Sequence, residues 1–289
     1  MDEPTVPKTW ENILKNKFTV ALTHTKFIHI TAPKFSLFII MKTIALFGLS
    51  ADPPTGRSGH LGILLHLLNL HFFDEIWIIP VYTHVFANKK NLQPFEHRVA
   101  MCKLNFEKYS SSEVPVVVKE LEREICESSL QTSTTSSSSG RVGTIDLIRH
   151  IKSIEPDINI HLVLGSDTFS DLVQGKWKES VAVLNEVSFE VFSRQGVSAD
   201  LQELLQETNR SQYIRIHNSA TLDNVSSTAI RAALSARPVP DDLSAVRLGL
   251  EPAVFDYIKS NHLYERLITD ASPSTVTTTA TVPANDSKI

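Results

Sequence analysis

The chain has 289 residues, of which 42% are apolar and 21% charged, and its formal net charge is −4. These values are typical of a globular protein with room for one large domain or two small ones, and the charge gives no reason to expect nucleic acid as a partner. The two cysteines, Cys102 and Cys126, fit no metal-ligand spacing and make a poor disulfide framework. We therefore expect a reducing, cytoplasmic environment, with an organellar one left open.

The ends of the chain differ in composition from its middle. Residues 1–40 are predicted to be an extension outside the fold, and the acidic Asp2, Glu3 and Glu11 argue against a transit peptide. The apolar run over residues 37–49 is interrupted by Lys42 and is shorter than the ~20 residues that cross a bilayer, so no membrane partner is expected. Two Ser- and Thr-rich segments are predicted to be disordered, an insertion at 128–141 and a tail at 268–289, which leaves one domain over 41–267.

Within this domain, short apolar strands alternate with helical patterns. Strands are predicted over residues 43–47, 75–79, 114–118, 158–164, 188–192 and 213–216. Helices are predicted over residues 61–72, 94–108, 144–154, 168–184, 199–208 and 227–236. Buried strands separated by helices indicate an α/β fold with a doubly wound, Rossmann-like parallel sheet covered by helices on both faces. Such sheets bind ligands where the strand order reverses.

A glycine-rich turn, residues 48–60, joins the first predicted strand to its helix. Gly56 and Gly59 allow close approach of the backbone, and the N–H groups at the start of the helix favour a phosphate. His60, at the mouth of this helix, adds a side-chain donor. Taken alone, His60 is better explained as a capping or surface histidine, and the surrounding loop and the second segment favour the functional interpretation.

A second segment, Val225-Ser226-Ser227-Thr228-Ala229-Ile230-Arg231, places three hydroxyls and an arginine at the start of another predicted helix. It fits two descriptions equally well. One is a capped helix with a solvated arginine, and the other is a phosphate clamp.

Together, the two segments resemble the signatures of the nucleotidylyltransferase superfamily. Within it, the chain is most similar to the nicotinate- and nicotinamide-nucleotide adenylyltransferases. Four weaker matches, in order along the chain, carry that similarity: His97-Arg98…Met101, Thr144-Ile145-Asp146, Gly165-Ser166-Asp167…Trp177 and Val254…Tyr257-Ile258…Leu263-Tyr264.

The first signature departs from the family pattern in two ways. Ala51 stands where the family usually has an aromatic residue, and Thr55 lies five positions before His60 instead of three. The longer loop puts a phosphate contact by Thr55 in doubt. We hypothesise that Arg57 takes over part of the charge.

The resemblance implies adenylyl transfer from ATP to nicotinate or nicotinamide mononucleotide, with Mg2+ bridging the phosphates and no dedicated metal cage. The 5′-phosphate of the mononucleotide attacks, so no general base is needed. The implied catalytic residues are His60 and Arg231. The implied ATP- and phosphate-binding residues are Gly48, Ser50, Thr55, Gly59, Ser226, Ser227 and Thr228, and the implied mononucleotide-binding residues are Lys89, Arg98, Thr144, Gly165, Asp167, Trp177 and Arg194.

Several of these residues have simpler explanations that the sequence leaves open. Lys89 fits a solvated loop, Trp177 a core position, and Asp167 a helix N-cap. At the level of function, two alternatives stay open: a superfamily member with another phosphate acceptor, such as phosphopantetheine, and a nucleotide-binding protein without turnover. The preference for nicotinate or nicotinamide, and the oligomeric state (a homo-oligomer included), are also open.

Overall fold

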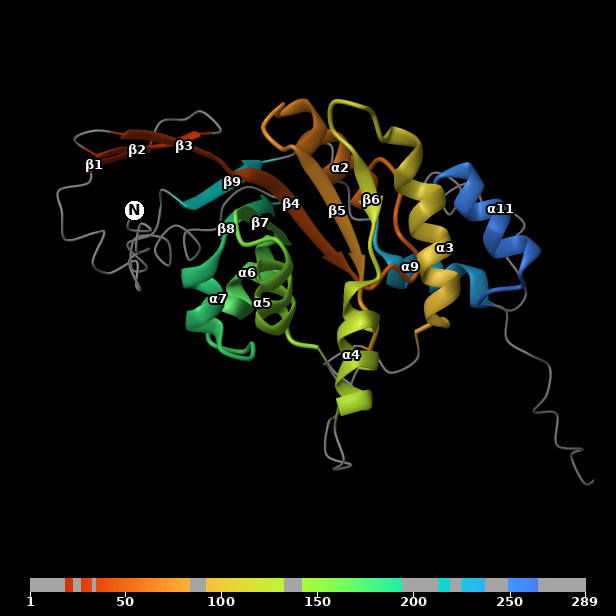
Figure 1. Cartoon of the computed structure of the whole chain (residues 1–289). Helices are drawn as coiled ribbons and strands as arrows, with labels where there is room; N and C mark the ends of the chain where they lie inside the picture. The colour runs from red at the N-terminus through yellow and green to blue at the C-terminus, as the bar shows by residue number, and fades with distance from the viewer. Residues whose placement is uncertain are drawn as a thin grey trace, which may run out of the picture.

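The computed structural model describes residues 19–22, 27–32, 35–83, 92–132, 142–193, 213–218, 225–236 and 249–264. Its centre is a six-stranded sheet with the strand order β6-β5-β4-β7-β8-β9, and every neighbouring pair is parallel (Figure 1). The strands are β4 (Lys42–Leu49), β5 (Glu75–Pro80), β6 (Val116–Val118), β7 (Ile158–Gly165), β8 (Ser188–Ser193) and β9 (Ile214–Asn218). The order reverses between β4 and β7, which makes this pair the switch point of a doubly wound sheet and confirms the predicted fold class.

One or two helices lie between most successive strands of this sheet, and two more follow β9. The helices are α2 (His60–Asn69), α3 (Phe95–Phe106) with the 3-10 turn η2 (Glu107–Tyr109), α4 (Leu121–Thr132), α5 (Thr144–Ile154), α6 (Ser166–Val173), α7 (Ser180–Glu186), α9 (Ser227–Ser235) and α11 (Pro252–Ser260). Within the described ranges, no helix combines the length and apolar character that a membrane crossing requires.

Alternation along β4 separates two apolar cores. Ile44 and Leu46 face one core with the buried side chains of α4, α5, α6 and α7, while Ala45 and Phe47 face the other with those of α2 and α3. All four β4 side chains are at most 5% exposed, because a strand buried on both faces has no solvent side. The end of β4 is therefore placed with little freedom, and the candidate site begins there.

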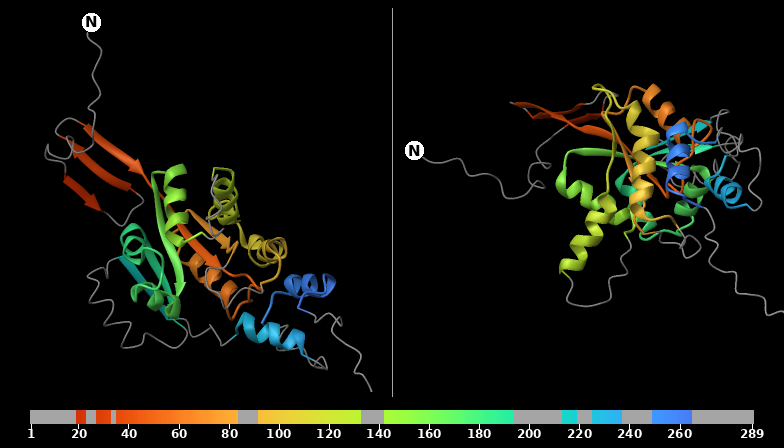
Figure 2. Two further views of the ribbon diagram at one scale, coloured as in Figure 1. Left: turned by 90° about the horizontal axis from the view of Figure 1, so that it is seen from below. Right: turned by 90° about the vertical axis from the view of Figure 1, so that its right-hand side faces the viewer.

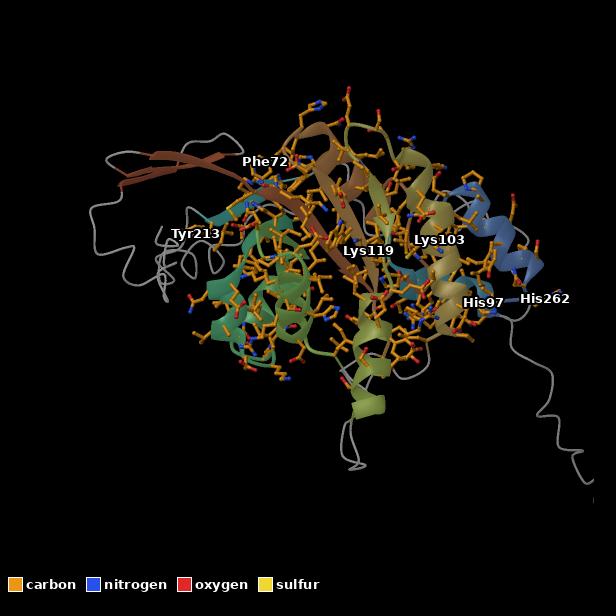
Figure 3. All side chains as sticks on the ribbon, viewed as in Figure 1. Phe72, His97, Lys103, Lys119, Tyr213 and His262 are labelled. Carbon is orange, nitrogen blue, oxygen red and sulfur yellow. The ribbon has the colours of Figure 1, made fainter. Side chains whose placement is uncertain are left out.

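A third, smaller core joins the C-terminal helix to the domain. Met101 of α3, Ile230 and Leu234 of α9 and the buried side chains of α11 form it. His97 Nδ1 lies 2.8 Å from the Tyr257 hydroxyl and connects α3 to α11 at its edge (Figure 3). This cluster packs α9, which carries the second signature, against α3 and α11.

Residues 19–40 contain a separate antiparallel sheet of three strands, β1 (Thr19–Leu22), β2 (Phe27–Ala32) and β3 (Phe35–Ile40). It forms no strand pair with the six-stranded sheet among the described residues, and Figure 2 shows it beside that sheet. The apolar run over residues 37–49 is thus divided between β3 and β4. Whether residues 1–40 are dispensable for the fold stays a prediction.

The structure differs from the prediction in two places, and three predicted segments lie outside the described residues. The single helix predicted over 168–184 is two helices, α6 and α7, because Gly175 adopts φ +77° after α6. Helix α4 was not predicted at all, and it extends into the Ser-rich segment as far as Thr132, so the predicted disorder is wrong for 128–132. The predicted helix over 199–208, residues 133–141 and the tail 268–289 lie outside the described residues.

A buried carboxylate, Glu190 of β8, joins three strands of the sheet. It is 0% exposed and accepts hydrogen bonds from His161 (2.7 Å), His217 (2.6 Å) and Arg215 (2.8 Å through Nε). Burial alone would raise the pKa of Glu190, but these three donors outweigh it and lower the pKa to about 2. The His217 ring stacks on Phe192, which lines the candidate site, so this network supports one wall of that site.

The Glu190 network predicts an acid-dependent stability. Because the folded-state pKa lies below the ordinary 4.5, the carboxylate stabilises the fold above pH 4.5, and this is lost as the pH falls toward 2. The amount is about 3 kcal/mol. Urea unfolding between pH 3 and pH 7 should show that Glu190→Gln is much less stable than the parent at pH 7, and that the difference shrinks with acid. The control Asp157→Asn, at an exposed turn, should show the same dependence of unfolding free energy on pH as the parent. If Glu190→Gln is as much less stable than the parent at pH 3 as at pH 7, the prediction is contradicted.

Candidate functional site

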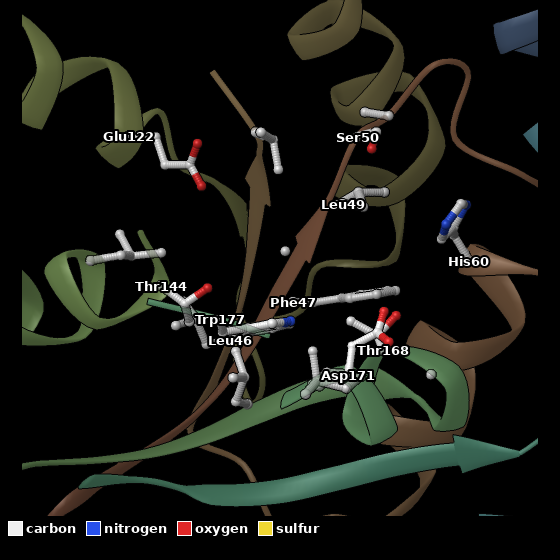
Figure 4. A pocket seen from close by; sticks show the side chains of 18 of the residues that line it. Leu46, Phe47, Leu49, Ser50, His60, Glu122, Thr144, Thr168, Asp171 and Trp177 are labelled. Atoms are coloured by element: carbon white, nitrogen blue, oxygen red, sulfur yellow. The ribbon is translucent and has the colours of Figure 1, made fainter. Parts of the chain in front are cut away.

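A pocket of about 660 Å³ opens at the carboxyl ends of β4 and β7, at the switch point of the sheet. Gly48 and Gly165 lie at these strand ends and line it. A Cβ atom built on either glycine would meet nothing within 4 Å, so both positions face open space that a ligand can fill. Figure 4 shows the pocket with His60 at one end and Thr144 and Trp177 at the other.

The predicted histidine is held in place by a residue of its own loop. The Thr55 hydroxyl accepts a hydrogen bond from the His60 N–H (2.8 Å) and lies 2.8 Å from the ring nitrogen Nδ1. The Thr55 backbone N–H donates to the same Nδ1 at 3.0 Å. Because Nδ1 accepts these bonds, the ring proton sits on Nε2. His60, which lines the pocket, is thus set up as a donor through Nε2.

This geometry gives Thr55 a role that the sequence did not predict. The residue is 1% exposed, its hydroxyl bonds to His60, and it does not lie in the pocket lining. Thr55 therefore positions His60, while its phosphate contact stays a prediction. Gly59 is required for the contact between Thr55 and His60, since a Cβ there would come within 2.1 Å of the Thr55 hydroxyl oxygen. Gly59 itself lines the pocket.

The second signature packs directly against the first. The Ser227 hydroxyl donates to the Pro53 carbonyl at 2.8 Å, and Arg231 donates to the Asp52 carbonyl at 2.5 Å. Ser227 also lines the pocket with His60. The second segment, far away in sequence, thus packs against the loop that carries the first.

The remaining hydroxyls of this segment have defined partners. Ser226 caps α9 by accepting from the Ala229 N–H at 3.1 Å, so the simpler interpretation as a helix cap is confirmed for this residue. Thr228 is exposed and accepts from Arg231 at 3.2 Å. Phosphate contacts by Ser226, Thr228 and Arg231 stay predictions.

At the other end of the pocket lie Thr144, at the start of α5, and Trp177, in the connection between α6 and α7. Trp177 is partly buried against the first core and also lines the pocket, so it serves the core and the site together. The carboxylate of Asp146 accepts from the Gly143 N–H and pairs with Lys178 at 2.8 Å, which fixes the start of α5.

Arg98, for which mononucleotide binding stays a prediction, is directed into the protein. Its guanidinium is 2% exposed and donates to four main-chain carbonyls, those of Gln93, Ser50, Val81 and Tyr82, at 2.5 to 3.1 Å. These carbonyls come from the ends of β4 and β5 and from the segment before α3. Arg98 therefore clamps the rim of the site from within the protein. Ser50, predicted to bind ATP, is one residue it holds, and it lines the pocket.

Two other predicted or hypothesised residues, Asp167 and Arg57, do not line the pocket. Asp167 is exposed in the first turn of α6 and is absent from the lining, and Gly165, not Asp167, is the N-cap of that helix. Arg57 is exposed, with its guanidinium 3.4 Å from the Tyr109 hydroxyl. Lys89 and Arg194 lie outside the described residues.

The sequence analysis missed two buried groups next to the site. Glu122 of α4 lines the pocket at 9% exposure, and burial raises its pKa to about 7 against the opposing effects of the Tyr82 N–H and Arg98. Asp52, 1% exposed, accepts from the Tyr264 hydroxyl at 2.8 Å and so connects the C-terminal segment to the signature loop. The apolar spacing of Leu121, Ile125 and Cys126 would have revealed α4, but nothing in the sequence indicates that Glu122 points inward.

The doubly wound sheet, and the contact of the second signature on α9 with the loop of the first, define a nucleotidylyltransferase. In agreement, a family model described as cytidylyltransferase-like matches residues 46–233. The chain therefore belongs to the cytidylyltransferase-like family and, by the relatives it matches, to its nicotinate-nucleotide adenylyltransferase branch.

Those relatives are bacterial proteins described as probable nicotinate-nucleotide adenylyltransferases. The one from Shouchella clausii is 28% identical, over 78% of this chain and 97% of its own length. The one from Myxococcus xanthus is 29% identical, over 71% and 88%. The one from Chloroherpeton thalassium is 30% identical, over 56% and 72%.

A solved structure shares the fold. The Plasmodium falciparum nicotinic acid mononucleotide adenylyltransferase, complexed with APC, has a TM-score of 0.58 and 22% identity, and the match covers 77% of this chain and 97% of that one. The same enzyme complexed with NaAD matches equally well.

The contact between Thr55 and His60 predicts a positioning effect on catalysis. Thr55→Val keeps the shape but removes the hydroxyl, so His60 is no longer held, and we expect kcat for pyrophosphate release from ATP to fall roughly tenfold to a hundredfold. Thr55→Ser, which keeps the hydroxyl and loses the methyl group, should retain most of the parental kcat. A role of Thr55 in packing alone would give the opposite order of the two variants. Thr43→Val, at the far end of β4, is the matched control. An unchanged kcat in folded Thr55→Val would contradict the assignment.

Proposed function

We propose that this enzyme transfers the adenylyl group of ATP to nicotinate mononucleotide, with pyrophosphate as the second product and deamido-NAD as the first. One observation carries the proposal: His60, held as an Nε2 donor, and α9, carrying Ser227 and Arg231, meet on one loop at one end of a pocket whose other end holds Thr144 and Trp177. The names of the bacterial relatives agree with this substrate class.

The reaction needs positioning and charge neutralisation more than proton transfer. The 5′-phosphate of the mononucleotide is already anionic at neutral pH, so it attacks the α-phosphorus without a general base and without a covalent enzyme intermediate. In the proposed mechanism, His60 donates to an α-phosphate oxygen, where negative charge increases in the transition state. Ser227 and Arg231 bind the β- and γ-phosphates as pyrophosphate leaves.

In this proposal Arg231 exchanges partners when ATP binds. Its guanidinium now donates to the Asp52 carbonyl and the Thr228 hydroxyl, and it is one-third exposed. Its Nη1 also lies 3.7 Å from Oδ2 of the buried Asp52 carboxylate, so phosphate oxygens would share or replace that ion pair. Gly48 and Gly165 leave the floor of the pocket open for the ligand.

Mg2+ supplies further neutralisation of the phosphates when it binds with ATP. Over the described ranges, no three His, Cys, Asp or Glu side chains are grouped so that they could hold a metal ion. In the proposal, Mg2+ would be held mainly by phosphate oxygens and water, as it often is.

The test of the function is an acceptor screen. Pyrophosphate release from ATP is measured with nicotinate mononucleotide, nicotinamide mononucleotide and phosphopantetheine in parallel. We expect turnover with a pyridine mononucleotide and none with phosphopantetheine. Turnover with phosphopantetheine alone, or ATP binding without pyrophosphate release from any acceptor, would overturn the proposal.

His60→Ala should lower kcat by about a hundredfold or more, because it removes a pre-positioned donor to the transition state. The KM values should change far less, and thermal melting should show that the fold is retained. The matched control is His71→Asn, an exposed histidine just beyond the other end of α2. Near-parental turnover of His60→Ala would refute its assigned role.

Arg231→Ala should weaken ATP binding and lower kcat together, because the same guanidinium contacts the phosphates before and during transfer. Arg149→Ala, which removes an exposed arginine of α5 paired with Glu179, should change neither. Calorimetric ATP titration and steady-state rates are the measurements. If the affinity for ATP and the rate both stay at the parental values, Arg231 is not part of the clamp.

A further inference from the structure

Glu122 is a buried acidic residue of the pocket lining, and the proposed reaction assigns it no role. It lies in the first turn of α4, is 9% exposed, and accepts the Tyr82 N–H through Oε2 at 2.8 Å. Figure 4 shows its carboxyl group directed into the pocket at the end where Thr144 and Trp177 also lie. A carboxylate this buried is costly unless something compensates its charge.

The protein itself supplies little compensation. The lysines of the pocket lining are paired elsewhere: Lys176 with Asp171 at 2.6 Å and Lys178 with Asp146 at 2.8 Å. The positive charge of Arg98 does act on Glu122. However, the N–H groups of Arg98 donate to main-chain carbonyls and not to the Glu122 carboxylate.

Two further groups complete the surroundings of Glu122. Arg123, next in sequence, pairs with Glu120 at 2.5 Å, and the buried Cys126 thiol has its pKa raised by burial and stays neutral. Within the described part of the chain, no lysine or arginine forms an ion pair with Glu122. Consistent with a poorly compensated charge, burial raises the pKa of Glu122 to about 7.

The pyridine ring of a nicotinate or nicotinamide mononucleotide is quaternised at nitrogen by its ribose, so the ring carries a positive charge. An aromatic face and a nearby carboxylate are the two protein groups that recognise such a cation. Trp177 and Glu122 provide both at the same end of the pocket. Resting on the proposed function, we propose that Glu122 recognises the positive charge of the pyridinium ring and selects this form of the mononucleotide over one with a neutral ring.

The proposal explains why the carboxylate is buried and unpaired in the free protein. The ligand supplies the missing positive charge, and the attraction between the two charges is stronger in the low dielectric of the pocket than in water. The ring nitrogen is cationic in the acid and in the amide, but the carboxylate of nicotinate offsets this charge, so we expect the effect of Glu122 to be larger for the amide.

Two ligands that differ in ring charge test it directly. Nicotinamide mononucleotide has a cationic ring, and its 1,4-dihydro form has the same ribose, phosphate and amide with a neutral ring. Affinities of the full-length chain for both are measured by calorimetry, with the parent and with Glu122→Gln, which keeps an acceptor for the Tyr82 N–H. We expect Glu122→Gln to weaken binding of the cationic form at least about tenfold and the neutral form little, so that the preference is lost.

The controls separate charge from structure. Glu124→Gln, an exposed residue of the same helix, should keep the parental preference, Glu122→Asp should keep most of it, and ATP affinity should be unchanged in all three variants. A folded Glu122→Gln with the parental preference would overturn the proposal.

A measurement on the parent needs no variant. Near pH 7, binding of the cationic form should release protons from Glu122, as calorimetry in buffers of different ionisation enthalpy detects, while the neutral form should release fewer. Equal release would also overturn the proposal. Turnover without ring-charge preference would remove the role of Glu122 alone, whereas ATP binding without any mononucleotide binding or pyrophosphate release would remove the proposed function with it.

Discussion

The position of the loop between β4 and α2 depends on hydrogen bonds that other parts of the chain donate to its backbone. Arg98 of α3 holds the Ser50 carbonyl, and Arg231 and Ser227 of α9 hold those of Asp52 and Pro53. A loop of this length has many conformations, and ordering it costs entropy that these bonds offset. Because Thr55 in turn holds His60, the orientation of one imidazole depends on helices that lie far away in sequence.

The pocket therefore has two ends of opposite character. Donors gather where β4 passes into α2 and where α9 begins, which suits a polyphosphate. A buried carboxylate and an aromatic face lie at the other end, which suits a flat cationic ring. In the proposed reaction the two substrates are thus sorted by charge along one pocket, and their reacting phosphates meet at the strand ends between them.

Much of the fold was predictable, and the physical reason is burial on both faces of the sheet. Strands such as β4 and β7 are continuous apolar runs, and α5 begins and ends at the predicted residues because Thr144 to Ile154 has a clear helical period. Helix α4 was missed because Ser-rich residues obscure its second half. A charged residue in a family motif suggests a ligand contact, and nothing in the sequence indicated that Arg98 donates to carbonyls from three separate segments.

By itself, the sequence determined the order of strands and helices, the two signatures and the class of chemistry, since these depend on local periodicity and on residue types at short spacing. Only the tertiary structure decided which side chains face the ligand. It turned Thr55 toward His60, buried Arg98 among carbonyls and directed Glu122 into the pocket. The reason is that a side chain's partners are set by packing between distant segments, and such contacts leave no pattern in the neighbouring sequence.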